Sequence, residues 1–342
     1  MSGGFSANLL VGAVDVLLAG LTQSAANLIT PGYAVTGLAN YYFLVVSTLV
    51  VTGVGTWVTV RIVEPRLGVY RGEAPLKKLE PLTGQEKRGL IHAALFALLA
   101  TGVILSGLLP IDGFLRDPQQ TTDPILRSLF FTHLVPFLFI MGLGLGLAYG
   151  LGAGTVRSDR EVVLGMEKSM ATLASYLVLA FFAAQFIAYF NWTNLGIILA
   201  VKGAELIRSA GLEQMPVPLL IALVLLSAVI NLIVGSASAK WALLAPIFVP
   251  MFMLLGYSPE LVQAAYRVGD SCTNIITPLM AYFPLILTFA QRYDRQAGIG
   301  TMIAAMLPYS MAFLLGWTIL LVIWVLLGLP VGVNAPLYLP GR

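Results

Sequence analysis

The sequence has little charge, little sulfur chemistry and no recognisable catalytic motif. Only 10% of its 342 residues are charged, against about 25% in a typical soluble domain. The single cysteine, Cys272, excludes an internal disulfide framework. The two histidines, His92 and His133, have no cysteine or carboxylate cluster beside them, so no metal-ligand spacing is present. A Walker motif, a GxSxG elbow and a nucleophile–base pair are also absent, so we expect neither ATP-driven transport nor an enzyme.

Long apolar windows fill most of the chain instead. Hydrophobic residues make up 58% of the sequence, and the net charge is only +3. We therefore predict an all-α polytopic membrane protein whose partner is the lipid bilayer and not nucleic acid. A spanning helix needs about 20 apolar residues. On that rule the predicted segments are 4–23, 40–62, 89–110, 128–153, 170–192, 217–234, 237–255, 260–290 and 303–328.

The distribution of Lys and Arg orients these segments. Basic residues gather in the loop 64–88 and in the loops near 154–169 and 291–300, so these loops are predicted to be cytoplasmic. The loops alternate between the basic, cytoplasmic side and the opposite side of the membrane only if 217–255 does not cross the membrane twice. We therefore predict that 217–255, whose two arms are joined by GSAS, is a re-entrant hairpin that enters and leaves the membrane on the same side. The chain is then one transmembrane domain, 1–342, with about seven spans and one hairpin.

Charge and helix-breaking residues coincide within 231–278. This stretch is apolar enough for a membrane, yet it contains Lys240, Arg267 and Asp270. Ionisable groups in hydrocarbon are costly and mark binding sites or pathways. Irregular backbone at membrane depth occurs only where protein or a cavity covers it. The combination predicts the broken helices of a secondary transporter's binding region.

Two interpretations of the acidic and basic residues are open. Arg267 and Asp270 are three residues apart and share a helix face, so they could form a structural ion pair with each other. Alternatively they belong to a substrate or ion site. The stretch SCTNIITP after Arg267–Asp270 can unwind, which would free carbonyl groups and the side chains of Thr273 and Asn274 to ligate Na⁺, or leave Asp270 to exchange a proton.

The hairpin tip and the first segment add candidates. Ser238 lies in GSASAKW, where small residues let backbone approach a ligand or another helix. Trp241 either anchors the tip or stacks on an aromatic substrate, and Lys240 snorkels or pairs with an acid. Asp15 is the acid of the first segment and serves either helix packing or ion binding.

The first segment and the region 231–278 each contain a short stretch of similar sequence. SANLL at 6–10 is similar to CTNII at 272–276: each has an Asn, Asn8 or Asn274, followed by apolar residues, and each has an aspartate nearby. Inverted repeats in transporters give rise to weak internal sequence similarity of this kind.

Four stretches together resemble the p-aminobenzoyl-glutamate transporter (AbgT) family: GFSANLLVGAVDVLLAG, IVEPRLG, VGSASAKWALLAPIFVPM and SPELVQAAYRVGDSCTNIITPLMAYFPLIL. The resemblance runs from end to end and implies an inverted-repeat, homodimeric secondary transporter of the bacterial inner membrane. Members of the family are longer, so the resemblance predicts that an N-terminal part with two spans and a first hairpin is missing here.

By resemblance the function is ion-coupled transport of p-aminobenzoyl-glutamate, related folate catabolites or sulfonamide antimetabolites. The substrate would be an aromatic carboxylate, the coupling ion Na⁺ or H⁺, and no other cofactor is expected. The substrate-binding residues would be Ser238, Trp241, Pro259, Arg267, Asp270 and Pro278. The ion-coupling residues would be Asp15, Asn8, Asp270, Thr273 and Asn274. The alternative is a truncated membrane scaffold whose buried polar residues only hold helices together.

Overall fold

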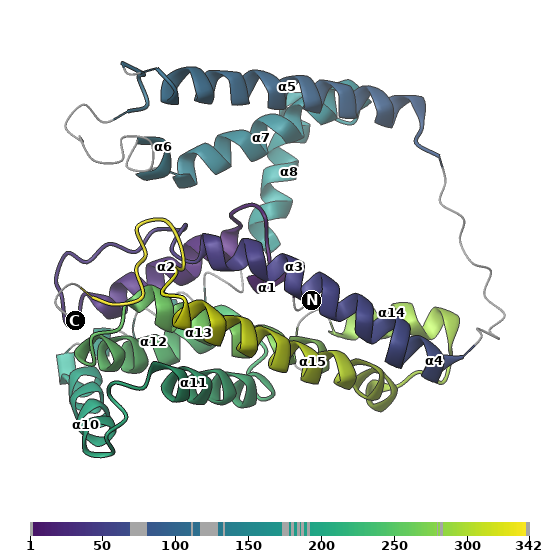
Figure 1. Ribbon diagram of the computed structural model, residues 1–342. Coiled ribbons are helices and arrows are strands. Elements are labelled where there is room, and N and C mark those ends of the chain that lie inside the picture. Colours follow the sequence, from purple (N-terminus) through teal and green to yellow (C-terminus); the bar gives the residue numbers. More distant parts are fainter. Residues whose placement is uncertain are drawn as a thin grey trace. The chain divides into compact units, whose positions relative to one another are not determined.

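The computed structural model of the chain is helical throughout the part that it describes (Figure 1). The described residues are 3–68, 81–110, 112–116, 129–132, 134–172, 178, 181–182, 185, 188–189, 192–278, 280 and 283–339. The chain divides into two compact units, Met1–Pro75 with Phe181–Arg342, and Leu76–Ala180. We call them unit 1 and unit 2. The expectation of one domain for 1–342 stays a prediction.

Unit 1 is a bundle formed by an N-terminal part and a C-terminal part of the sequence. Its helical elements are α1 (Gly3–Ser6), α2 (Ala13–Ala26), α3 (Tyr41–Val58), the π-helix η1 (Thr59–Val63), α4 (Glu64–Leu67), α10 (Leu195–Ser209), α11 (Pro216–Asn231), α12 (Ala237–Leu254), α13 (Pro259–Thr273), the 3₁₀-helix η2 (Asn274–Ile276), α14 (Phe283–Tyr293) and α15 (Ile299–Leu326). Unit 2 contains α5 (Gly84–Leu108), α6 (Leu129–Thr132), α7 (Leu134–Ala153) and α8 (Asp159–Thr172).

Five stretches of the described chain are long and apolar enough to cross a membrane, namely Tyr41–Leu67, Gly84–Leu108, Pro136–Ala153, Ala237–Leu254 and Ile299–Leu326. Two shorter apolar helices, Val14–Ala26 and Pro216–Asn231, accompany them. Many of their large apolar side chains face outward, as lipid contact requires. The chain is therefore a multi-pass membrane protein, as its composition predicts. Most of the predicted segment 170–192 lies outside the described residues.

Two of the predicted segments are interrupted. The segment 4–23 is not one spanning helix, because α1 ends at Ser6 and α2 begins at Ala13. The segment 260–290 divides into α13, η2 and α14. The break predicted after Asp270 is therefore present, but Ser271–Thr273 still belong to α13 and the α-helix ends only at Thr273. Gly12 before α2, and Pro278 after η2, stand in these breaks, where helix continuity is weakest.

The helix α13 is the centre of unit 1. Every one of its residues is buried, and it contacts α1, α2, α11, α12 and α15. Gly269 allows a close approach to α11. A Cβ atom added there would lie 2.1 Å from the carbonyl oxygen of Val224 on α11. The backbones of α11 and α13 therefore touch without side chains between them, as is common between membrane helices.

The predicted hairpin appears as two helices joined by residues 232–236. Its arms have different neighbours: α11 packs mainly on α13, and α12 packs on α10 and α2. The structure thus shows the helix–turn–helix, while its re-entry into one side of a membrane stays a prediction.

In unit 2, α5 and α7 lie side by side along most of their length (Figure 1). Glycines of α7 form this contact, because Gly144 faces the ring of Phe96 and Gly152 faces His92. The glycine-rich run of α7 thus serves close helix packing.

Candidate functional site

The first ion pair of the candidate site joins two helices that are far apart in the sequence, α2 and α13. Arg267 on α13 pairs with Asp15 on α2 through Nη2 and Oδ1, 2.6 Å apart, and both side chains are almost completely buried. The other carboxylate oxygen of Asp15 accepts from the Gly12 N–H at 2.6 Å and from Asn8 Nδ2 at 2.7 Å. The unwound stretch between α1 and α2 therefore orients the aspartate toward the arginine.

The same arginine also holds the end of α1. Its Nη2 donates to the carbonyl of Phe5 at 2.5 Å and its Nε donates to Ser6 Oγ at 3.3 Å. Ser271 on α13 donates to the same Ser6 hydroxyl at 2.7 Å. The two sequence stretches that echo each other, around Ser6 and around Ser271, therefore meet in space.

The second ion pair lies near the hairpin tip. Lys240, in the first turns of α12, contacts the Asp270 carboxylate, and the two side chains are 0% and 2% exposed. Tyr266 donates to Asp270 Oδ1 at 3.3 Å and to the carbonyl of Ala237 at 2.5 Å. The interpretation in which Arg267 and Asp270 pair with each other is wrong. Each has a partner on another helix, because helix packing places Asp15 and Lys240 closer.

Asn231 connects the two arms of the hairpin to this pair. Its Oδ1 accepts from the Lys240 ammonium. Its Nδ2 faces three oxygen atoms, the Asp270 carbonyl at 2.6 Å, Thr273 Oγ1 at 2.8 Å and Asn274 Oδ1 at 2.9 Å. These are oxygens of the stretch predicted to ligate a cation, and here they converge on a protein amide. The cation-binding role of Thr273 and Asn274 stays a prediction.

Sequence reasoning missed Asn231 as a site residue. The signal that pointed to it was weak, since it is one amide at the end of an apolar helix, directly before the hairpin turn. Its importance follows from α11 lying against α13, which no local pattern encodes.

Trp241 is fully buried beside the site. Its Nε1 donates to Thr22 Oγ1 at 2.8 Å, and its ring stacks on Tyr266 with centroids 4.4 Å apart. Thr22 in turn donates to Gln263 at 2.8 Å. In this arrangement Tyr266 covers one face of the indole, and stacking on an aromatic substrate stays a prediction.

The remaining predicted residues shape the backbone around the site. Ser238 is the second residue of α12, where its hydroxyl lies 3.3 Å from that of Ser236. Pro259 is the first residue of α13 and needs no hydrogen-bond acceptor there, and Ser258 caps the same helix. Pro278 follows η2 in the break before α14. The structure does not bring Pro259 and Pro278 together, since they flank opposite ends of α13–η2.

A further buried carboxyl lies at the start of α13, a helix that is not among the five stretches long and apolar enough to cross a membrane. Glu260 is 3% exposed and accepts from the hydroxyl of Tyr33 at 3.1 Å. Burial raises the pKa of Glu260 to about 7, although the hydrogen bonds from Tyr33 and Ser258 oppose the rise. The pKa of Tyr33 is raised too, first by burial and then by the Glu260 charge. Sequence reasoning did not single out this pair.

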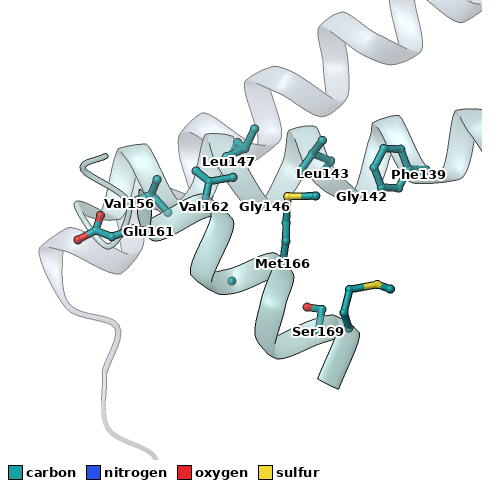
Figure 2. A pocket seen from close by; sticks show the side chains of 12 residues that line it. Phe139, Gly142, Leu143, Gly146, Leu147, Val156, Glu161, Val162, Met166 and Ser169 are labelled. Atoms are coloured by element: carbon teal, nitrogen blue, oxygen red, sulfur yellow. The ribbon is translucent and has the colours of Figure 1, made fainter. Parts of the chain in front are cut away.

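A groove of about 510 Å³ in unit 2 has a different character (Figure 2). It lies between α7 and α8, where Met166 points toward the glycines of α7. Glu161 is the charged side chain in its lining, and its carboxylate accepts from the N–H groups of Arg157 and Ser158. The lining is otherwise mainly apolar, so this groove has no paired charges that would recognise a carboxylate.

The ionic cluster of unit 1 is balanced but costly. It contains two cations, Arg267 and Lys240, and two carboxylates, Asp15 and Asp270, all almost inaccessible to water. Buried ion pairs contribute little net stability, because desolvation offsets their attraction. Clusters of this kind inside membrane proteins mark sites where charged ligands or protons bind. The geometry suits a ligand with carboxylates, which could take the place of an aspartate beside each cation.

Comparison with known proteins identifies the family of the chain. A family profile described as the AbgT putative transporter family matches residues 1–339. The p-aminobenzoyl-glutamate transport protein of Escherichia coli (strain K12) is 39% identical over 329 residues, which are 96% of this chain and 64% of that protein. The chain therefore spans less than two thirds of the length of this curated relative.

Two solved structures are also similar. The YdaH transporter of Alcanivorax borkumensis shares 48% identity with a TM-score of 0.89, over 97% of this chain and 69% of that one. MtrF of Neisseria gonorrhoeae, described as illuminating a class of antimetabolite efflux pumps, shares 48% identity with a TM-score of 0.87, over 98% of this chain and 67% of that one.

Proposed function

The chain belongs to the AbgT putative transporter family, and from this premise we propose that it carries p-aminobenzoyl-glutamate or a related aromatic carboxylate across the membrane, coupled to an ion. Related folate catabolites and sulfonamide antimetabolites fall in the same chemical class. The observation that carries the proposal is the pair of buried ion pairs, Arg267–Asp15 and Lys240–Asp270, beside the break between α1 and α2 and the break after α13.

Arg267 is the first group proposed to bind a substrate carboxylate. Its guanidinium presents several donors in a plane, which suits bidentate binding of a carboxylate. Trp241 and Tyr266 form an aromatic surface beside the ion pairs, suited to the aminobenzoyl ring once the stack opens. Asp15 and Asp270 are the groups proposed to take part in ion coupling. A homodimer in the bacterial inner membrane is part of the proposal.

Flux into proteoliposomes tests the proposal. The purified chain is reconstituted, labelled p-aminobenzoyl-glutamate is added, and uptake is measured under an imposed H⁺ or Na⁺ gradient. We expect gradient-dependent uptake that Asp270→Ala and Arg267→Ala each reduce at least about tenfold, since each leaves a buried charge unpaired. Lys202→Met serves as control, because Lys202 is 75% exposed on α10.

Two results would contradict the proposal, one concerning the site and the other concerning transport itself. Uptake that Asp270→Ala and Arg267→Ala leave unchanged would remove the site from the proposal. Wild-type vesicles with no uptake under either gradient would favour the alternative, a membrane scaffold whose polar residues only hold helices together.

A further inference from the structure

The groove between α7 and α8 in unit 2 is a cavity that the proposed transport does not use. Its volume of about 510 Å³ lies within the range of about 300–1,000 Å³ that is usual for small-molecule sites. Most of its lining is apolar and includes Phe139, Leu143 and Leu147 from α7 and Met166 from α8 (Figure 2). Water finds few hydrogen-bond partners in such a groove, so the groove favours an apolar ligand.

Three glycines leave this groove open. Gly142 and Gly146 on α7 and Gly165 on α8 line it, and a Cβ atom added to any of them would meet no other atom within 4 Å in the described part of the chain. Gly144, on the α5 side of the same helix, instead lies against the ring of Phe96. The glycines of the groove therefore do not serve contact between helices, and free space remains along the surface of α7.

The groove extends from the end of a membrane-spanning stretch toward the membrane interior. The stretch Pro136–Ala153 of α7 is long and apolar enough to cross a membrane. Residues shortly after Ala153 therefore lie at the level of the lipid headgroups, whereas Phe139 lies in the hydrocarbon. Figure 2 shows Val156 and Glu161 at one end of the groove and Phe139 at the other. The groove thus passes from polar to apolar surroundings, as a phospholipid molecule does.

Four cations gather at the polar end of the groove. The start of α5 lies beside the end of α7, because a Cβ atom at Gly152 would lie 3.0 Å from the carbonyl oxygen of Arg88. Lys87 and Arg88 therefore lie at the same end of unit 2 as Arg157 and Arg160, which belong to the turn between α7 and α8 and to the first turn of α8. Within the described residues, none of these four side chains forms an ion pair with a carboxylate.

The acidic residues of this end are bound to the starts of helices. Glu161 accepts from the N–H of Ser158 at 3.3 Å, and Glu86 accepts from the N–H of Thr83 at 2.7 Å. Asp159 accepts from the N–H of the residue that follows it at 2.9 Å. Because carboxylates at helix starts satisfy free N–H groups there, the neighbouring cations remain available to a phosphate.

We infer that the groove between α7 and α8 binds an anionic phospholipid of the surrounding membrane. One acyl chain lies along Leu143 and Phe139 on α7. The phosphate binds beside Arg157 and Arg160 at the polar end. Basic residues next to a spanning helix attract anionic headgroups, and the planar guanidinium group suits phosphate oxygens. This lipid site belongs to unit 2 and does not depend on the proposed transport.

Photo-crosslinking in vesicles tests the inference. The purified full chain is reconstituted into phosphatidylcholine vesicles that contain a small fraction of phosphatidylglycerol with a diazirine on one acyl chain. Parallel vesicles contain phosphatidylcholine with the same diazirine chain. After illumination, peptide mass spectrometry locates the attached lipid. We expect phosphatidylglycerol to label the groove-lining residues of α7 and α8 at least about fivefold more than phosphatidylcholine does, because of the basic residues at the polar end.

Gly146→Leu tests the acyl-chain part of the site. The larger side chain occupies the free space of the groove, so we expect its labelling by phosphatidylglycerol to fall at least about fivefold. Gly102→Leu on α5 is the matched control. An added Cβ there also meets open space, but Gly102 does not line the groove, so labelling should be unchanged.

Arg157→Gln/Arg160→Gln tests the headgroup part. Both side chains are exposed, so we expect the variant to fold even if Gly146→Leu does not. The groove keeps its shape but loses two cations, and labelling by phosphatidylglycerol should fall to the level of phosphatidylcholine. Lys202→Gln on α10, whose side chain is 75% exposed, removes a cation elsewhere and should have no effect.

Three outcomes would overturn the inference. The first is equal labelling of the groove by the two lipids in the wild type. The second is labelling by phosphatidylglycerol that neither Gly146→Leu nor the double arginine variant lowers. The third is no labelling of the groove by either lipid, which would show that protein, from this chain or from a second copy, covers it. All three would leave the proposed transport standing.

Discussion

The burial of Glu260 makes the stability of the folded protein depend on pH. Its carboxyl has a pKa raised from 4.5 to about 7 by burial, so the folded protein holds this proton at pH values where the unfolded chain has lost it. The folded state then binds more protons between the two values. The free energy of unfolding therefore falls as pH rises from about 4.5 to about 7, by on the order of 3 kcal/mol from this group.

Glu260→Gln tests that dependence. The amide keeps the shape and can still accept from Tyr33, but it cannot ionise. We expect the variant to lose the decline in stability across this range, as measured by thermal unfolding in detergent at about pH 5 and about pH 8. Parallel pH profiles for the variant and the wild type would show that the carboxyl does not control stability.

Trp241 shows how one hydrogen bond supports a buried ring. Trp241→Phe keeps an aromatic ring over Tyr266 but removes the donor to Thr22. We expect a loss of about 1–2 kcal/mol in the free energy of unfolding, because a buried hydroxyl loses a partner. Trp57→Phe is the control, since Trp57 is 57% exposed. If Trp57→Phe lowers the free energy of unfolding as much as Trp241→Phe does, the loss comes from the smaller ring and not from the hydrogen bond to Thr22.

Among the elements, α11 and α13 depend on one glycine. Gly269→Ala would place a Cβ 2.1 Å from the Val224 carbonyl and 2.8 Å from Ser227 Cβ. The helices would have to separate, so we expect a loss of about 3 kcal/mol in the free energy of unfolding. Gly102→Ala on α5 has open space around the added Cβ and should cost nothing measurable. Thermal unfolding of both variants measures the loss of stability. Equal stability of the two variants would show that α11 and α13 can move apart at little cost.

The helices themselves could be predicted from the sequence far better than their contacts. Apolar length located α3, α5, α7 and α15. Polar residues and proline located the break after α13, because they weaken helix continuity locally. The partners of Arg267 and Asp270 could not be predicted in this way. Spacing suggested that they pair with each other, while packing of distant helices selects Asp15 and Lys240.

For the whole molecule, Cys272 is a natural reporter of unfolding. It is the single cysteine of the chain and is buried in α13. The control is the variant Cys272→Ser/Ser158→Cys, which moves the thiol to an exposed position of unit 2. We expect a maleimide to label Cys272 at least about a hundredfold more slowly than the control's thiol, because labelling requires unit 1 to open. Mass spectrometry follows both reactions, and comparable rates would show that α13 is accessible in the native state.

The meeting of Asp15 with Arg267 has a consequence for how the protein is made. During synthesis the stretch containing Asp15 leaves the ribosome long before α13 exists, so this aspartate first enters its surroundings without the cation that neutralises it in the finished bundle. The nascent chain must keep Asp15 in contact with water or with other polar groups until α13 arrives. The candidate site is therefore assembled only late in biogenesis, by the closing of a contact between residues that are far apart in the sequence.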